Sequence, residues 1–336
     1  MKTDKILLDH GNGGKISHHL ISDMLLPIFD NPILSQLNDS AILNIQGKSL
    51  AFSTDTFTVD PVFFPGGNIG DIAVNGTVNN LAMCGASPLY LSVGLVIEEG
   101  FSMADLEKIL KTMKTAAGNA SMQIVTGDTK VVPKGAADNI FINTSGIGLI
   151  PAVADIAVHK ACVGDKIIVS GDIGDHGIAV LSQREGMSFE SSVISDTAPL
   201  NYVVKKMLMR TKEIHVLRDP TRGGVGTALN EIADKSDVGI QIYEDKIPVK
   251  DEVARICELL GVDPLYVANE GKFLAFVRED HAEMILEAIR RDKVAKGACI
   301  IGEVVSDHPG KVVMETRIGG TRIVDMLTTD QLPRIC

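Results

Sequence analysis

The chain has 336 residues, of which 45% are hydrophobic and 22% charged, and its formal net charge is -11. These values favour a folded protein of two domains of about 150 residues each. The acidic balance, without any basic run, excludes nucleic acid and anionic membranes as general partners. Five scattered cysteines lack zinc-ligand spacing, and the N-terminus has no apolar signal core. We therefore expect reduced thiols in a cytoplasmic protein without a membrane span.

The first predicted element is a glycine-rich loop, residues 10–14, followed by an amphipathic helix with Ile16, Leu20 and Met24 on one face. Although the loop is rich in glycine, it lacks the upstream glycine and the Ser or Thr of a Walker A loop.

A hairpin is predicted next, from strands over residues 41–45 and 49–54. Asp39 and Asp55 lie at the ends of these strands. The two carboxylates are expected either to bind a divalent cation together or to cap separate turns.

The helix predicted over residues 69–84 carries a polar stripe. Asp71, Asn75 and Asn79 recur every four residues and share one face. Asn is a weak helix former, so the stripe is either a solvated face or a polar wall opposite Asp39 and Asp55.

A buried strand is predicted over residues 89–97, and Ser102 is predicted to cap the next helix. The strand at 124–126 is expected to run into a turn, Gly127-Asp128-Thr129-Lys130. A backbone amide, a carboxylate, a hydroxyl and an ammonium within four residues indicate a binding site more than a plain turn. The strand over 141–150 closes the first half.

The second half alternates strands and helices, which favours an α+β sandwich over a doubly wound sheet. We expect domains at 1–154 and 155–320, followed by a mobile tail at 321–336. The glycine-rich turn at 171–177 is a weak anion-site signal. Residues 218–224, with two arginines at a helix start, favour a phosphate site.

The chain ends in Cys336, whose thiol lies beside the terminal carboxylate. Like charge disfavours activation of the thiol, so it suits an attachment point better than a catalyst. The 16 residues from Thr321 span roughly 50 Å when extended. We therefore hypothesise a tail that moves between a retracted and an extended position.

Several segments resemble the HypE family of hydrogenase maturation proteins, within the ATP-dependent superfamily of aminoimidazole ribonucleotide synthetase and selenophosphate synthetase. The similar motifs are HGNGG at His10, TDTFTVDPVFFPGGNIGDIAVNGTVN at Thr54, VTGDTKVV at Val125, RDPTRGGV at Arg218, ANEGK at Ala268 and the terminal PRIC. The resemblance implies two α/β-sandwich domains, with the N-terminal sheets pairing in a homodimer and a flexible C-terminal tail.

The resemblance also implies a reaction. A HypF-type carbamoyltransferase would load a carbamoyl group onto the terminal thiol, ATP with Mg²⁺ would drive its dehydration to a thiocyanate, and the HypC–HypD complex would receive the cyanide for nickel-iron hydrogenase. Phosphorylation turns the amide oxygen into a leaving group, so the site needs a metal-phosphate cradle and a base.

Site residues follow from the resemblance, motif by motif. Cys336 would carry the group, while Glu270 and Lys130 would handle protons; Lys130 could alternatively hold a phosphate. Asp39, Asp55 and Asn80 would hold Mg²⁺. The nucleotide would be bound by His10, Gly11, Gly13, Gly14, Asp55, Asn79, Asn80, Gly127, Asp128, Thr129, Arg218, Asp219, Arg222 and Gly223.

One position departs from the family pattern. Asn80 stands where the family has Asp, which removes one charge from the expected magnesium site and predicts slower ATP turnover. Two alternative functions stay open: a small-molecule synthetase of the same superfamily, and a non-catalytic thiol carrier.

Overall fold

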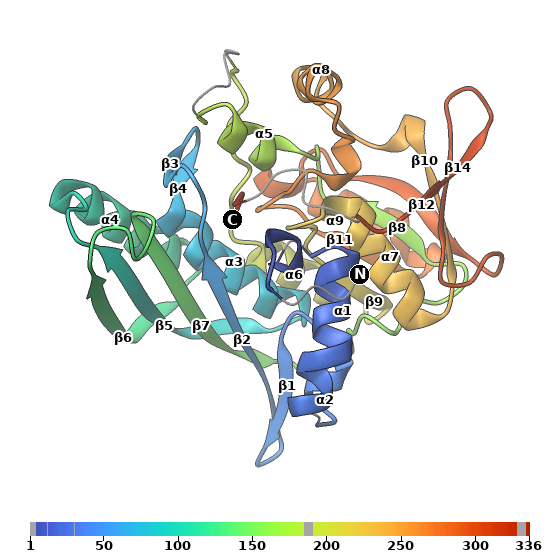
Figure 1. Ribbon diagram of the computed structural model, residues 1–336. Helices are drawn as coiled ribbons and strands as arrows, with labels where there is room; N and C mark the ends of the chain where they lie inside the picture. Colours follow the sequence, from blue (N-terminus) through green and yellow to red (C-terminus); the bar gives the residue numbers. More distant parts are fainter. Residues whose placement is uncertain (1–4, 12, 30, 185–190, 328–333) are drawn as a thin grey trace.

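The computed structural model describes residues 5–11, 13–29, 31–184, 191–327 and 334–336. Each half of the chain forms its own mixed sheet with helices, which confirms the α+β class (Figure 1). The first sheet has the strand order β1-β2-β7-β5-β6, and the second has the order β14-β13-β10-β12-β8-β11-β9. Within the described ranges, no helix combines the length and apolar character needed to cross a bilayer.

The elements of the first half are α1 (Lys15–Leu20), η2 (Ile21–Leu25), α2 (Leu26–Phe29), β1 (Ala41–Ile45), β2 (Lys48–Phe57), β3 (Phe63–Phe64), β4 (Gly67–Asn68), α3 (Ile69–Met83), β5 (Ser87–Glu98), α4 (Met103–Asn119), β6 (Gln123–Val132) and β7 (Ile140–Ile150). Those of the second half are β8 (Lys166–Val169), α5 (Asp175–Leu181), α6 (Asn201–Leu208), β9 (Ile214–Arg218), α7 (Gly224–Ser236), β10 (Gly239–Tyr243), α8 (Asp251–Leu260), β11 (Leu274–Val277), α9 (Glu279–Ile289), β12 (Cys299–Val305), β13 (Val312–Glu315) and β14 (Thr321–Val324).

The first sheet is buried on one face only. Helix α3 packs on β2 and β7, and α4 packs on α3. Strand β7 alternates buried and exposed residues, as period-2 patterning requires. The opposite face leaves Phe52, Ile147, Leu149 and Tyr90 exposed, so β5 is half-buried and not the buried strand that the sequence predicted.

The predicted turn at Gly127 is wrong, because residues 123–132 form one continuous strand, β6. It pairs in parallel with β5 as far as Val132, so the backbone stays extended through the polar residues. A Cβ at Gly127 would lie 2.5 Å from the Val93 carbonyl oxygen, which explains the glycine without any turn.

The second sheet is covered on both faces. Helix α7 packs with one set of strand side chains, while α6 and α9 pack with the other. The tail was expected to begin at Thr321, but Thr321–Val324 is β14, paired with β13 in the sheet. The segment beyond the sheet therefore begins at Asp325, and residues 328–333 lie outside the described part.

The N-terminal helix is also less buried than its pattern predicted. Residues 15–29 form three short helical pieces, α1, η2 and α2. Ile16 and Leu20 are half-buried, but Met24 and Ile28 are exposed. Lys15 ties this segment to the C-terminal region, with its N–H donating to the Leu327 carbonyl oxygen at 2.7 Å.

Candidate functional site

A small acidic cavity lies where the two halves of the chain meet. It encloses about 20 Å³. Its lining comes from the end of β2, from α3, from the loop before α7, from the segment before β11 and from the last residue of the chain. The lining residues are Asp55, Thr56, Phe57, Gly76, Asn80, Asp219, Thr221, Arg222, Glu270 and Cys336.

The carboxylates of this acidic cavity all have raised pKa values. Burial raises the pKa of Asp219 to about 8, with neighbouring acids adding to the effect. Burial raises the pKa of Asp55, which Arg222 and a hydrogen bond from Asn80 oppose. Burial and the charges of Asp219 and Asp55 raise the pKa of Glu270 well above its usual range.

Unpaired acceptors accompany this excess of negative charge. Asp219 Oδ2 and Glu270 Oε2 are buried without a hydrogen-bond partner among the described residues. Such oxygens are costly to bury unless something compensates them. Carboxylate and amide oxygens around a small cavity are the ligand set of a hard divalent cation, so the donor set fits Mg²⁺.

Glu270 is held through its own backbone. Its N–H donates to Asp196 Oδ1 at 3.0 Å, and its carbonyl accepts from Asn79 Nδ2 at 3.0 Å. Lys272 Nζ lies 3.2 Å from Asp196 Oδ2. A Cβ at Gly271 would lie 1.8 Å from the Asp196 carbonyl oxygen, so only glycine permits this approach.

Asn79, expected among the nucleotide ligands, is engaged within the protein. Besides Glu270, its Nδ2 donates to the Ala198 carbonyl at 3.1 Å, and its Oδ1 accepts from the Leu200 N–H at 2.8 Å. The side chain is buried. Asn79 therefore joins α3 to the second half of the chain and positions Glu270.

The terminal segment, residues 334–336, is docked at the acidic cavity. Thr58 N–H donates to Cys336 O at 3.2 Å, and Asp60 N–H donates to Arg334 O at 3.1 Å, as in a short strand pairing. Arg334 Nε returns a bond to Thr58 O at 2.9 Å. Ile335 is 3% exposed, and its side chain lies in the hydrophobic core that is formed mainly by the first half of the chain. This docking brings Cys336 and Glu270 to one cavity, as the predicted retracted position requires.

Asp39 is not part of the acidic cavity lining. Its Oδ1 lies 2.5 Å from Arg218 Nη1, while Arg218 Nη2 lies 2.5 Å from Glu231 Oε2. Burial raises the pKa of Asp39 to about 6 although Arg218 opposes the shift. This ion-pair network borders a separate cavity of about 410 Å³ under the N-terminal helix.

The glycine-rich N-terminal loop lies against the arginine loop, as expected for two segments that are both predicted to bind the nucleotide. Arg222 Nη1 donates to Gly11 O at 2.9 Å, and Gly13 lies against the Arg222 backbone. Gly223 has a φ of +76° and caps α7. His10 accepts the Leu7 N–H through Nδ1 at 3.0 Å, so its ring is used within its own turn.

Lys130 lies far from the acidic cavity within one copy of the chain. The β2-β7-β5-β6 order places β6 three strands from β2, about 14 Å away. Asp55 pairs with Thr144 on the helix-covered face, whereas Asp128 and Lys130 project from the other face. Lys130 pairs with Asp128 at 2.7 Å, and both are exposed. Gly127 and Thr129 share this strand, so none of the four reaches Glu270 here.

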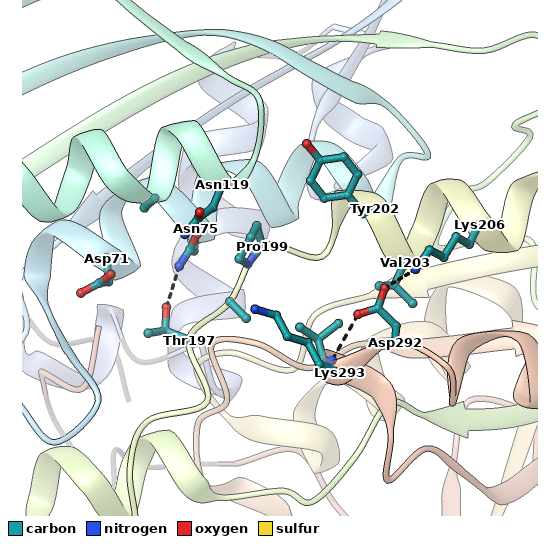
Figure 2. Close-up of a pocket in the computed structure, with 13 residues that line it drawn as sticks. Asp71, Asn75, Asn119, Thr197, Pro199, Tyr202, Val203, Lys206, Asp292 and Lys293 are labelled. Atoms are coloured by element: carbon teal, nitrogen blue, oxygen red, sulfur yellow. Dashed lines mark hydrogen bonds and ion pairs between the residues drawn. The ribbon is translucent and has the colours of Figure 1, made fainter.

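A larger cavity of about 510 Å³ lies between α3, α4 and α6 (Figure 2). Asp71 and Asn75 face it, so the polar stripe of α3 points to the second half of the chain and not to Asp55. Asn75 Nδ2 donates to Thr197 Oγ1 at 3.1 Å, while its buried Oδ1 has no hydrogen-bond partner in the part of the chain that the structure describes. Asp55, Asp219 and Glu270, the carboxylates of the acidic cavity, do not line this larger cavity.

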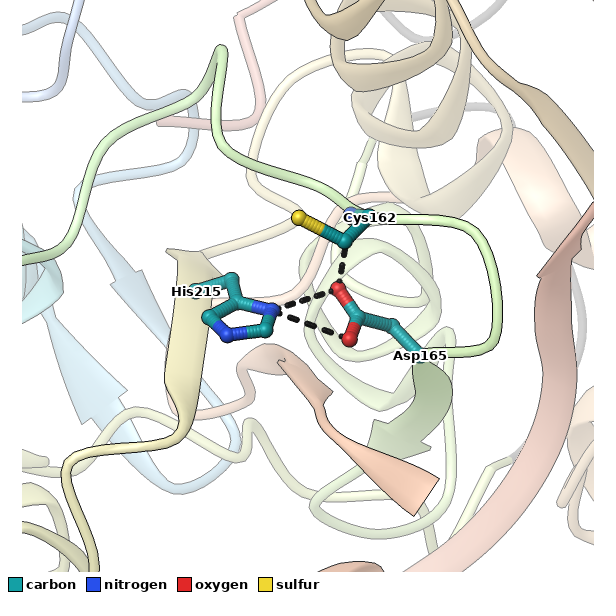
Figure 3. A group of neighbouring side chains, drawn as sticks. All are labelled: Cys162, Asp165 and His215. Atoms are coloured by element: carbon teal, nitrogen blue, oxygen red, sulfur yellow. Dashed lines mark hydrogen bonds and ion pairs between the residues drawn. The ribbon is translucent and has the colours of Figure 1, made fainter.

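Cys162, Asp165 and His215 form a separate cluster, with potential ligand atoms within 4.8 Å of one another (Figure 3). Asp165 Oδ2 accepts the Cys162 N–H at 2.9 Å, and both carboxylate oxygens lie 2.9 Å from His215 Nδ1. These contacts close the turn before β8 and tie it to β9. These hydrogen bonds give the cluster a structural role, because they hold the turn before β8 against β9.

Sequence reasoning missed three residues of the site: Thr58, His176 and Asp196. Thr58 acts through its backbone, which leaves no residue-type signal. Asp196 belongs to the polar run Ser195-Asp196-Thr197, the only available hint. His176 was seen as part of a glycine-rich turn, but its contact with the chain end is visible only in three dimensions.

Family comparison agrees with this architecture. Residues 37–150 match the AIR synthase related protein, N-terminal domain, and residues 163–315 match the C-terminal domain of the same family. The fold and the acidic cavity between the two halves of the chain thus define a two-domain protein of the AIR synthase related class.

Curated relatives narrow the class. The chain is 48% identical over 330 residues to carbamoyl dehydratase HypE of Bradyrhizobium diazoefficiens, covering 98% of this chain and 95% of the relative. It is 42% identical over 338 residues to the Escherichia coli carbamoyl dehydratase HypE, covering 99% and 100%. A solved HypE in complex with ATP superposes with a TM-score of 0.83 at 51% identity, covering 99% of this chain and 100% of that chain. The chain belongs to the HypE family of hydrogenase maturation proteins.

Proposed function

We propose that this protein is an ATP-dependent carbamoyl dehydratase whose substrate is a carbamoyl group on its own Cys336. The observation that carries the proposal is that Cys336 lines the same cavity of about 20 Å³ as Glu270, Asp55 and Asp219. The docked terminus occupies the space beside these carboxylates, so a group carried on Cys336 would lie against them. This favours a tail-borne substrate over a small-molecule synthetase.

The proposed reaction converts S–C(=O)–NH₂ and ATP into S–C≡N, ADP and phosphate. The C–O bond breaks and the oxygen leaves on phosphate, while one nitrogen proton passes to Glu270 and the other leaves with the phosphate. Bound as its magnesium complex, ATP supplies the phosphoryl group that makes this oxygen a leaving group. Asp55, Asp219 and Asn80 are the proposed cation ligands, which Asp39 would join once released from Arg218. Arg222 is placed to balance phosphate charge.

Glu270 is the proposed acceptor of a nitrogen proton, because its buried carboxylate has an oxygen without a partner among the described residues and lines the cavity with Cys336. Asp219, which shares both features, is assigned to the cation. Burial and the charges of Asp219 and Asp55 raise its pKa and so favour the protonated form of the side chain. Neutralising those two carboxylates removes part of the like charge, and Glu270 can then act as a base.

The proposed homodimer would complete the site. The uncovered face of the first sheet exposes Phe52, Ile147 and Leu149, an apolar surface suited to a second copy. Lys130 projects from that same face and cannot reach Glu270 of its own chain. We therefore propose that Lys130, with Gly127, Asp128 and Thr129, acts on the cavity of the partner copy.

Two partner proteins are proposed from the reaction. A HypF-type carbamoyltransferase would load Cys336, in line with a solved HypE–HypF complex whose HypE chain superposes with a TM-score of 0.88 at 48% identity, covering 92% of this chain and 99% of that chain. A HypC–HypD complex would accept the cyanide.

Intact mass spectrometry tests the proposal. After incubation with HypF, carbamoyl phosphate and ATP, Cys336 should gain a carbamoyl group and then lose one water. A Cys336→Ser chain should gain neither. A carbamoylated chain that never loses water would instead support the thiol-carrier alternative, which the missing charge at Asn80 keeps open.

A further inference from the structure

His176 contacts the docked end of the chain from the opposite side to Thr58. It lies in α5, is completely buried, and its Nε2 is 2.9 Å from the Ile335 carbonyl oxygen. Nδ1 is 2.8 Å from Ser195 Oγ. The ring packs edge-on against Phe64, with centroids 5.3 Å apart at 89°. The imidazole is thus fixed on three sides.

These partners determine where the ring carries its proton. A carbonyl oxygen only accepts, so Nε2 must be the N–H donor to Ile335. Nδ1 then accepts from the Ser195 hydroxyl, whose oxygen accepts the Thr197 N–H at 3.2 Å. Burial lowers the pKa of His176, although the Asp196 charge opposes this, so the ring is neutral near pH 7.

We infer that His176 is a positioning residue that fixes the Ile335–Cys336 peptide and thereby directs the terminal thiol into the acidic cavity. The bonds from Thr58 and Asp60 hold the terminal segment from the first half of the chain. His176 holds it from the second half, one peptide away from the reacting sulfur. The role in catalysis rests on the proposed dehydratase function, whereas the docking itself does not.

A buried histidine with two partners is often only a packing element, but this one has a specific dependence on the tail. When the terminal segment leaves, the Nε2–H loses its acceptor inside the protein, and such an unsatisfied donor is costly. The bond therefore shifts the equilibrium toward the docked terminus. Ile335, whose side chain fills an apolar site, contributes in the same direction.

Alkylation of Cys336 by iodoacetamide, followed by peptide mass spectrometry, measures this equilibrium. Docked Cys336 is only partly exposed and lines a cavity of about 20 Å³, so undocking should raise its alkylation rate. His176→Leu removes the donor and should raise the Cys336 rate about tenfold. His176→Gln keeps an N–H donor near the Nε2 position and should stay within about threefold of wild type. Exposed Cys162 is the internal standard, and buried Cys84 and Cys257 monitor the fold.

Ser195→Ala serves as a second variant, because it removes the hydroxyl that fixes the His176 tautomer and leaves the imidazole ring in place. It should raise the Cys336 rate about threefold to fivefold. An unchanged rate in both His176→Leu and Ser195→Ala would overturn the inference, as would equal acceleration at Cys84 and Cys257, which marks a merely structural role.

Dehydration of carbamoylated protein in a single turnover separates the two claims. His176→Leu should slow it and His176→Gln should restore it. If wild type itself shows no dehydration, the proposed function fails, while the alkylation rates still decide the role of His176.

Discussion

Replacing Asn80 by Asp tests the acidic cavity most directly. The Asn80 amide now donates to Asp55 and lowers its pKa. In Asn80→Asp this bond to a charged group is lost, and a further carboxylate joins Asp55, Asp219 and Glu270. The lost bond alone corresponds to about 2 kcal/mol of stability. Without a cation, we expect the melting temperature to fall by about 5 °C.

Magnesium should reverse the sign of the effect. The added carboxylate restores one charge to the proposed ligand set, so Mg²⁺ affinity should rise about tenfold. Asn80→Asp should therefore be less stable than wild type in EDTA and as stable or more stable with Mg²⁺. ATP-dependent dehydration should also become faster. Thermal unfolding in both buffers, with a Mn²⁺ titration followed by electron paramagnetic resonance, measures these quantities.

The neighbouring asparagine provides the matched control. Asn79 Nδ2 donates to two backbone carbonyls, so Asn79→Asp places a carboxylate against acceptors outside the cation site. It should destabilise the protein equally with and without Mg²⁺. If Asn80→Asp behaves in this same way, or binds Mn²⁺ no tighter than wild type, the acidic cavity is not a cation site.

Three further predictions concern pH, the partner copy and the tail. Folding raises the pKa of Asp219 from about 4 to about 8, so the folded state binds more protons than the unfolded state between these pH values. Without Mg²⁺, the stability of the protein should therefore fall from about pH 6 to about pH 8. The increase in melting temperature caused by Mg²⁺ should grow over the same range. A gain independent of pH would contradict this. Mixing Lys130→Ala with Glu270→Gln chains should restore about one quarter of wild-type dehydration, because half of the dimers are mixed and each holds one intact site; no recovery would place Lys130 outside the chemistry. Ile335→Ala should raise Cys336 alkylation by at least about tenfold with little change in melting temperature, and an unchanged rate would show that the side chain does not hold the tail.

How far the sequence predicts the fold depends on how local the determinants are. The hairpin of β1 and β2 follows from alternating side chains and was predicted, as was the cap of α4 by Ser102, which accepts the Asp105 N–H. Strand β14 was missed because Val324 alone among its residues is buried, so no apolar pattern marks it. The Gly127 segment was predicted wrongly because its glycine is required by the close approach of the neighbouring strand and not by a local turn.

The same distinction between local and long-range determinants applies to the candidate site. The resemblance implied that Glu270 lies beside the group carried on Cys336. The sequence could not show how they meet, because their shared cavity depends on contacts across more than 200 positions, such as Thr58 with Cys336. Asn79 illustrates the reverse case. The resemblance implied a nucleotide ligand, while its helix position left a solvated face or a polar wall open. The structure shows a link to the backbone of Glu270, which spacing within one helix cannot reveal.

The charge of the acidic cavity gives the proposed tail cycle a direction. A thiolate on Cys336 would add a negative charge to a cavity in which Asp55, Asp219 and Glu270 already have raised pKa values, whereas a carbamoyl thioester is neutral. The free thiolate is therefore better placed outside, where it must attack the carbamoyl donor. Once capped, the terminus loses this penalty, while the bonds from His176 and Thr58 are unchanged. Loading the carbamoyl group would thus itself favour the docked position, without a further signal.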